Sequence, residues 1–126
     1  MPLRTDDIQL AENFHSREFM CPHCGKWKDN QPFRKFIKKL QIAREKAGVP
    51  FVINSGYRCE EYNIYINGAL NSQHLTGAAA DIATNNWTRL AIVKGLIKAE
   101  LRIIIYSGHI HTDPLPAGIL YGGESK

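Results

Sequence analysis

Hydrophobic residues recur at helical spacing in two segments of the chain. In residues 32–47 the apolar positions follow a 3.6-residue period, after a proline that suits the first turn of a helix. Gly48 then stands where a left-handed C-terminal cap belongs, and a proline two residues later prevents further helix. Residues 87–99 repeat the pattern after Asn86, which suits an N-cap, although Gly95 lowers the helix propensity. The spacing therefore predicts two helices whose apolar faces belong to the core.

Three shorter segments have the composition of β-strands. Residues 51–54 and 102–106 are rich in β-branched and aromatic side chains, which favour extended structure. Residues 78–82 consist of alanines followed by an aspartate and an isoleucine, so this strand is expected to pack closely against a neighbour. A short helix is expected over residues 60–66, between the first two of these strands in the chain.

The length of 126 residues suits a single domain, residues 1–126, with one hydrophobic core. We expect frayed termini over residues 1–9 and 122–126. No stretch approaches the roughly 20 apolar residues of a membrane span. Acidic residues stand near the N-terminus where a signal peptide carries basic ones, so we expect a chain that is cytoplasmic as synthesised. We also expect a monomer.

The net charge of +4 favours a polyanionic partner, and both cell-wall polymers and nucleic acids qualify. Basic residues concentrate in residues 34–39, but helical spacing distributes them around a solvated face. The chain shows neither stacking aromatics on a basic groove nor a recognisable nucleic-acid motif. We therefore expect no nucleic-acid partner. The competing hypothesis of a nucleic-acid-associated zinc-knuckle protein rests on the positive charge and on a CxxC motif.

That motif is formed by Cys21 and Cys24, and Cys59 is the third cysteine of the chain. Two thiols at this spacing commonly bind a structural metal when further ligands arrive from elsewhere. With three cysteines, His23 or His15 would have to serve as the fourth ligand. Free or incidentally bridged thiols and a thioredoxin-like redox pair are the alternatives, although no βαβ context surrounds the motif. An odd cysteine count argues against a planned disulfide framework.

A histidine and an aspartate stand seven positions apart across small residues in the centre of the chain. These are His74 and Asp81, and the aspartate lies among apolar residues, where a carboxylate is costly unless paired or metal-bound. A later strand alternates so that His109, His111 and Asp113 share one face. Two histidines and an aspartate are good ligands for Zn²⁺. Three protein ligands leave one tetrahedral position open, which is typical of catalytic zinc.

A turn containing glycine follows the strand at residues 51–54 and presents Arg58 at the rim of a cleft. An arginine in this place is a candidate for gripping a carboxylate with two hydrogen bonds. The alternative interpretation is an ordinary surface arginine in a turn.

Taken together, three blocks resemble the zinc D-Ala-D-Ala peptidases. They resemble most closely the small murein peptidases of that family found in phages and bacteria. The resemblance runs from about Leu10 to Asp113, and the blocks occur in the family's order and spacing. The blocks are Ser55-Gly56-Tyr57-Arg58, Ser72-x-His74-x-x-Gly77-x-Ala79-x-Asp81 and His111-x-Asp113.

The resemblance implies an α+β fold, a small antiparallel sheet flanked by helices, of the hedgehog and D-Ala-D-Ala peptidase type. It implies that His74, Asp81 and His111 bind one catalytic Zn²⁺. Arg58 would hold substrate or stabilise the oxyanion, and Ser72 would orient substrate. The substrate would be a D-amino-acid-containing stem peptide of peptidoglycan, cut by a D,D-carboxypeptidase or by an endopeptidase. Such an endolysin-like enzyme would reach the cell wall after release or phage lysis.

One position departs from the family. Many members carry a catalytic carboxylate three residues before the last zinc histidine, where this chain has Gly108. His109 is the nearest substitute as general base, and Asp113 is a candidate for orienting a ligand histidine. If neither serves, the chain would be a catalytically silent, metal-binding relative that binds the cell wall. The three cysteines leave room for a second, structural ion.

Overall fold

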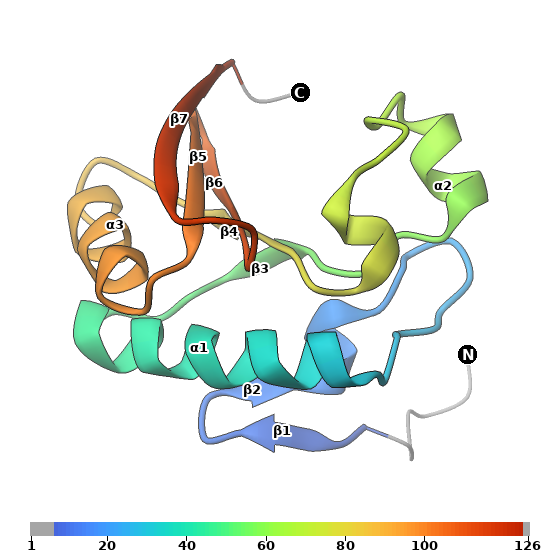
Figure 1. Ribbon diagram of the computed structural model, residues 1–126, viewed down its shortest axis with the longest axis horizontal. Helices are drawn as coiled ribbons and strands as arrows, with labels where there is room; N and C mark the ends of the chain where they lie inside the picture. Colours follow the sequence, from blue (N-terminus) through green and yellow to red (C-terminus); the bar gives the residue numbers. More distant parts are fainter. Residues whose placement is uncertain (1–6, 125–126) are drawn as a thin grey trace.

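The computed structural model describes residues 7–124. Within them, three α-helices and two short 3₁₀ helices accompany a five-stranded sheet and a separate two-stranded hairpin (Figure 1). The elements in chain order are β1 (Gln9–Ala11), β2 (Phe14–His15), η1 (Ser16–Phe19), α1 (Gln31–Ala47), β3 (Ile53–Ser55), α2 (Glu60–Tyr65), η2 (Gln73–Thr76), β4 (Ala80–Ala83), α3 (Arg89–Lys98), β5 (Arg102–Tyr106), β6 (His109–Asp113) and β7 (Gly118–Gly123).

The five strands lie in the order β3-β4-β6-β5-β7. The first four are antiparallel to their neighbours, whereas β7 runs parallel to β5. The α+β class is therefore confirmed, and the expectation of a wholly antiparallel sheet is wrong in this one strand. Residues 114–117 connect β6 to β7 past Arg102, where β5 starts, and this connection makes the last pair parallel.

The helix predicted over residues 32–47 is the longest element, and its ends follow local rules. The Asn30 side chain accepts a hydrogen bond from Phe33 N at 2.8 Å, and Gly48 adopts φ 70° as the C-terminal cap. One face of α1 is buried in the core. The buried residues on this face are Phe33, Phe36, Ile37, Leu40 and Ala43. The predicted apolar stripe is thus confirmed as core.

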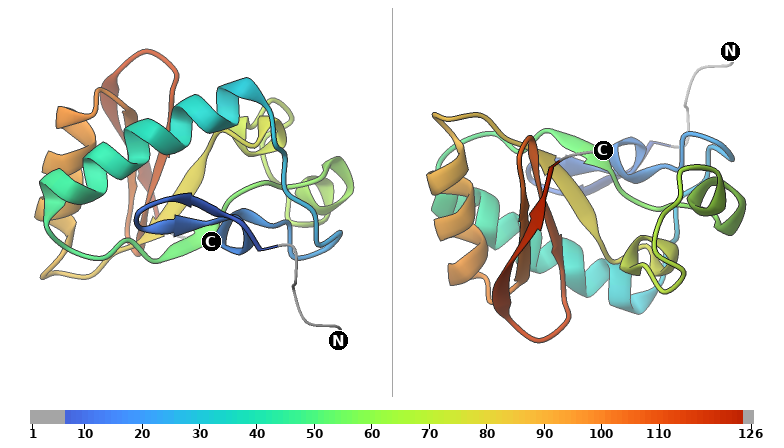
Figure 2. Two further views of the ribbon diagram at one scale, coloured as in Figure 1. Left: turned by 90° about the horizontal axis from the view of Figure 1, so that it is seen from below. Right: turned by 90° about the horizontal axis from the view of Figure 1, so that it is seen from above.

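α3 packs across the C-terminal half of α1, and the β1–β2 hairpin lies on the other side of α1 (Figures 1 and 2). The contact between the two helices centres on Gly95, whose missing side chain lets α3 approach Ala43 and Ala47. A Cβ atom at residue 95 would clash with the carbonyl oxygen of Ala43. The glycine that weakens the helix propensity is therefore required by the packing.

Both ends of the described segment contain strands. Gln9 begins β1, and both Gly122 and Gly123 lie in β7. The expectation that residues 1–9 and 122–126 fray stays a prediction. Residues 1–6 and 125–126 lie outside the described residues. β7 is exposed along its whole length, so no buried apolar face marks it in the sequence. The helix predicted over residues 87–99 also differs at its start. α3 begins after Thr88, because the Asn85 side chain caps a preceding turn.

Among residues 7–124, no helix is both long and apolar enough to cross a membrane.

Replacing Gly95 with alanine should destabilise the protein. Alanine favours a helix by about 1 kcal/mol over glycine, but forcing an extra carbon into this contact costs roughly 1–3 kcal/mol. We expect a net loss in the free energy of unfolding, measured by urea denaturation. Gly118→Ala is the matched control, since no atom lies within 4 Å of its added carbon. A Gly95→Ala variant as stable as this control would contradict the packing.

Candidate metal centre

Three side chains from different elements bring one ligand atom each to a common point. His74 lies in η2, Asp81 in β4 and His111 in β6. The distances are 3.1 Å from His74 Nε2 to Asp81 Oδ1, 3.1 Å from His111 Nδ1 to Asp81 Oδ1, and 3.2 Å between the two ring nitrogens. All three residues are buried. The structure therefore brings together the three predicted zinc ligands.

The size of this triangle fits a zinc ion. Zinc lies 2.0–2.1 Å from imidazole nitrogen, so the ligand atoms of a tetrahedral site are roughly 3.3–3.4 Å apart. The observed edges of 3.1–3.2 Å are slightly shorter. Two imidazoles and a carboxylate are also ligands that zinc accepts. His74, Asp81 and His111 could thus hold the ion with little rearrangement.

Sheet register accounts for two of the three ligands. β4 and β6 pair without a register shift, and Asp81 lies directly opposite His111. Directly opposed residues of antiparallel strands project to the same face. On the other side of β4, Ser55 of β3 is the partner of Asp81. Three adjacent strands therefore present a row of polar side chains on one face of the sheet.

The third ligand, His74, is oriented by backbone groups. Its Nδ1 lies 2.6 Å from the carbonyl oxygen of Gly56. Because a carbonyl only accepts, Nδ1 carries the proton and the lone pair of Nε2 faces the triangle. Gly56 is required here, since a Cβ atom would clash with the backbone of Phe19. Ser72 is the N-cap of η2, and its Oγ accepts a hydrogen bond from the backbone N–H of His74 at 3.2 Å.

His111 is oriented by a buried ion pair. Its Nε2 lies 2.6 Å from Oδ2 of Asp113, so that Nδ1 faces the triangle. Asp113 is fully buried, and Arg102 donates to both of its oxygens through Nε and Nη2. The structure thus places Asp113 where we expected a partner for a ligand histidine. It adds Arg102, which the sequence reasoning missed.

A signal for Arg102 was present in the sequence. A two-residue turn at residues 107 and 108 pairs Arg102 with Asp113 across the β5–β6 hairpin, and this is the observed register. An arginine opposite an acid in a buried strand indicates an ion pair.

Arg58 is attached to the triangle through Asp81. Its Nη2 donates to Oδ2 of Asp81 at 3.2 Å, while Oδ1 of the same carboxylate faces the two histidines. Its Nε and Nη1 donate to Ser55 Oγ and Asn63 Oδ1, each at 3.3 Å. Asn63 is buried and also bonds to the carbonyl of Ala69. Arg58 is therefore held in place by Asn63, whose supporting role no motif of the sequence indicates.

The charges of the site follow from these contacts. Burial alone would raise the pKa of Asp81, but the contacts of its carboxylate with the rings of His111 and His74 hold it well below its usual range. Burial would lower the pKa of His111, yet bonds with Asp113 and Asp81 outweigh it and raise that pKa. Burial would also raise the pKa of Asp113, but its bonds with His111 and Arg102 lower it to about 2. Both carboxylates are therefore ionised at neutral pH.

His109 projects from the same face of β6 as His111, because the strand continues without a register shift. Its ring stacks on that of Tyr106, with centroids 4.5 Å apart and planes 11° from parallel. Burial lowers the pKa of His109, and the negative charge of Asp81 partly offsets this effect. The imidazole is therefore neutral at pH 7 and able to accept a proton.

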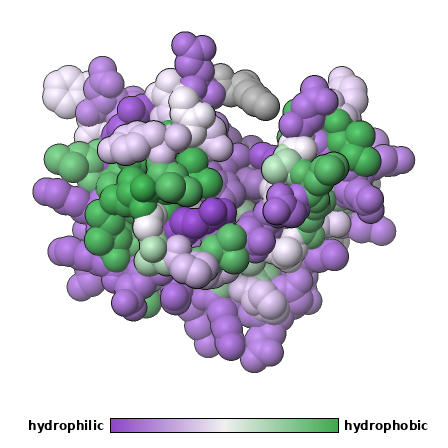
Figure 3. All heavy atoms as spheres, turned by 45° about the horizontal axis from the view of Figure 1, so that its top comes forward, coloured by the Kyte–Doolittle hydropathy of each residue, from purple (hydrophilic) through white to green (hydrophobic). Residues whose placement is uncertain are grey.

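Figure 3 shows hydrophilic side chains in a hollow between the lobe of β5–β7 and the lobe of α2. Hydrophobic side chains flank this hollow on both sides. A polar floor between apolar walls suits a peptide, whose backbone is polar and whose side chains vary.

The three cysteines form a second group whose ligand atoms all lie within 4.8 Å of one another. The fourth ligand that we expected is not in this group. His15 is 3.3 Å from Asp7, and His23 is 2.8 Å from Glu61. The side chain of each histidine is more than 40% exposed and lies against that carboxylate. The prediction that His15 or His23 completes the site is therefore wrong.

Replacing Asp113 with asparagine should weaken metal binding. The change removes the charge that orients His111, and losing such an outer partner typically costs 10–100-fold in metal affinity, or about 1.4–2.7 kcal/mol. Competition with a chromophoric chelator measures the affinity for zinc. Asp29→Asn is the control, because Asp29 forms an exposed pair with Arg34. Equal affinities in the two variants would contradict the role of Asp113.

Comparison with known proteins identifies the family of the chain. Residues 12–113 match the family described as Peptidase M15, and this segment covers well over half of the chain. A search of curated proteins found no significant match. The matched segment contains His74, Asp81 and His111 together with Arg58 and Asp113. The chain therefore belongs to the Peptidase M15 family, the D-Ala-D-Ala carboxypeptidase-like zinc peptidases.

Proposed function

We propose that the protein is a zinc metallopeptidase that hydrolyses D-amino-acid-containing peptide bonds of peptidoglycan. The observation that carries the proposal is the triangle of His74 Nε2, Asp81 Oδ1 and His111 Nδ1 in a chain of this family. When bound there, zinc polarises a carbonyl and lowers the pKa of a water molecule, which is the chemistry that peptide hydrolysis needs.

Arg58 is the residue that we assign to the negative charge of the substrate. Its three hydrogen bonds use three of the five N–H donors of a guanidinium. The remaining donors can bind a substrate carboxylate or the oxyanion that develops at the scissile carbonyl. Because its side chain is only 14% exposed, these donors act from a fixed position. Arg58 thereby orients the substrate and stabilises the transition state.

We assign proton transfer to His109, because Gly108 occupies the place of the family's carboxylate. The side chain lies two residues from His111 on the same strand face. From there an imidazole can take a proton from the attacking water and return it to the leaving amine. Stacking on Tyr106 limits the orientations of the ring.

The substrate class is proposed from three supports. The family is D-Ala-D-Ala carboxypeptidase-like, the motifs resemble murein peptidases, and the charge of +4 suits an anionic wall polymer. The reaction is removal of a terminal D-alanine or cleavage inside the stem peptide. Ser72 caps η2, and its hydroxyl oxygen accepts a hydrogen bond from the backbone N–H of His74. From this position we assign it the role of orienting the bound peptide.

Digestion of purified sacculi and defined muropeptides, read by mass spectrometry, tests the proposal. We expect zinc-dependent loss of D-alanine or new stem-peptide fragments, and the fragments identify the bond. Binding to sacculi without any new product would overturn the enzyme and favour a silent wall-binding relative.

Alanine in place of His111 or His109 should separate metal binding from catalysis. His111→Ala removes a ligand, so both zinc and activity should be lost. His109→Ala should retain one zinc at the triangle while kcat falls by about 10²–10⁴-fold, the usual contribution of a general base. Metal analysis and muropeptide kinetics on both variants provide the measurement. Equal loss of zinc in the two variants would contradict the assignment.

Replacing Arg58 with glutamine should lower kcat by about 10²–10³-fold, as loss of an oxyanion donor does. Arg17→Gln is the charge-matched control, because Arg17 is 68% exposed and its Nε lies 3.8 Å from Oδ2 of Asp7, away from the triangle. We expect the control to keep full activity in the same muropeptide assay. If both variants lose activity equally, the loss comes from the change in net charge and not from the specific contacts of Arg58.

A further inference from the structure

Cys21, Cys24 and Cys59 converge although they come from two separate segments of the chain. Cys21 and Cys24 lie in the loop before α1, and Cys59 is the N-cap of α2. The sulfur atoms of Cys21 and Cys59 are 3.7 Å apart, and all three cysteines are free thiols. Zinc binds thiolate sulfur at about 2.3 Å, so two such ligands of a tetrahedral ion lie roughly 3.8 Å apart. The separation therefore suits a shared metal ion.

Backbone N–H groups point at the sulfur atoms of Cys21 and Cys59. Gly25 adopts φ 69° and donates its N–H to the carbonyl of Cys21 at 2.8 Å, which closes a tight turn. The backbone N–H of Cys59 donates to Cys21 Sγ at 3.5 Å, and that of Tyr62 to Cys59 Sγ at 3.4 Å. Burial would raise the pKa of Cys21, but backbone N–H bonds from Cys59, Cys24 and His23 lower it to about 7.

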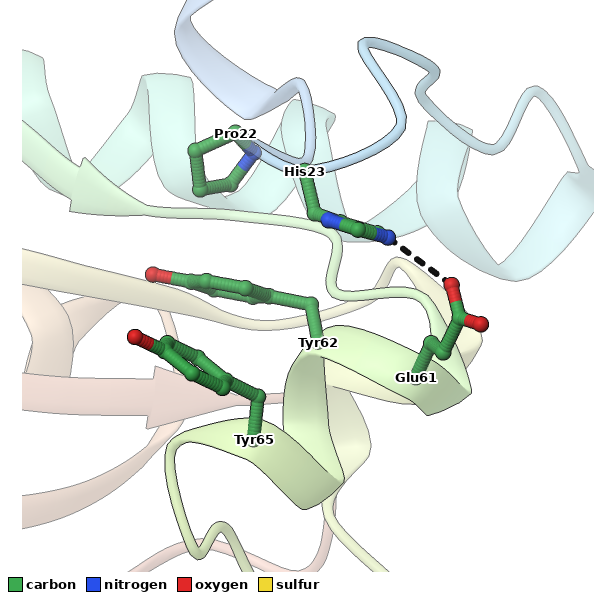
Figure 4. A pocket seen from close by; sticks show the side chains of 5 residues that line it. All are labelled: Pro22, His23, Glu61, Tyr62 and Tyr65. Carbon is green, nitrogen blue, oxygen red and sulfur yellow. Dashed lines mark hydrogen bonds and ion pairs between the residues drawn. The ribbon is translucent and has the colours of Figure 1, made fainter.

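The histidine inside the motif is engaged elsewhere. Figure 4 shows the His23 ring above that of Tyr62 with its Nε2 directed at Glu61. The two rings are nearly parallel, at 9°, with centroids 6.5 Å apart. No other histidine, cysteine, aspartate or glutamate of residues 7–124 joins the three sulfurs. The protein thus offers three ligands, and the exposed Cys24 marks the side open to solvent.

We propose that Cys21, Cys24 and Cys59 bind a second, thiophilic divalent ion, with its fourth position open to solvent. Soft thiolate ligands select zinc over magnesium or calcium. The ion would join the loop before α1 to Cys59, the N-cap of α2, which directly follows Arg58 in the chain. It would therefore brace the turn that carries Arg58, and this consequence alone rests on the proposed function.

Cobalt(II) titration of the full metal-free chain, kept reduced, tests the site. Thiolate-to-cobalt charge transfer absorbs in the near ultraviolet, and the triangle of two histidines and an aspartate has no thiolate to produce it. We expect two bound cobalt ions and this band in the wild type. His111→Ala should lose one ion and keep the band, so failure of the catalytic site would leave this result unchanged.

Cys24→Ser should lower the affinity for the second ion by more than the 10–100-fold that is typical when a residue hydrogen-bonded to a metal ligand is lost. Cys24 is exposed, so serine should not disturb the core. His23→Ala is the matched control from the same loop and should keep both the band and the affinity. A loss of affinity in His23→Ala would overturn the open fourth position.

Alkylation provides a measurement that needs no variant. Bound zinc should slow the reaction of the exposed thiol of Cys24 in the wild type with iodoacetamide. An absent charge-transfer band, or a Cys24 thiol that zinc leaves equally reactive, would overturn the site.

Discussion

The direct opposition of Asp81 and His111 across β4 and β6 is the constraint on which the site depends. It brings a carboxylate oxygen and a ring nitrogen to 3.1 Å inside the protein, and η2 adds His74 to the same point. Buried polar groups are costly unless each is bonded. The surroundings satisfy this requirement, since Arg58 takes the second oxygen of Asp81 and Asp113 takes the second nitrogen of His111. The three candidate ligand atoms are thus oriented by the protein alone.

A second set of residues holds the groups that orient His111 and Asp81. Behind His111, the carboxylate of Asp113 is neutralised by Arg102, which reaches it from the next strand. Behind Asp81, Arg58 is held by Asn63 of α2, which is itself bonded to the following loop. A rigid sheet therefore fixes one side of the centre, while a short helix and its loop fix the other. The shorter helix is the part that a metal at the cysteines would reinforce.

Local rules predicted much of this from the sequence. The helix ending at Gly48 follows from apolar spacing and a left-handed cap, and the ligands His74 and His111 follow from residue type and motif. What local rules miss is set by tertiary contact. β7 has no buried face to give it a pattern, and Asn63 is important only because Arg58 folds against it. The prediction of a histidine as fourth ligand for the cysteines was wrong, because a histidine that is close to them in sequence need not point its side chain at them.

Side chains of a strand change faces with every residue, so β6 has a consequence for how the chain tolerates insertions. One residue added inside β6, between His109 and His111, would leave these two histidines on opposite faces of the strand. The same addition within residues 114–117 would leave that ladder as it is. Homologous chains should therefore vary in length after Asp113 and keep a constant length from His109 to Asp113.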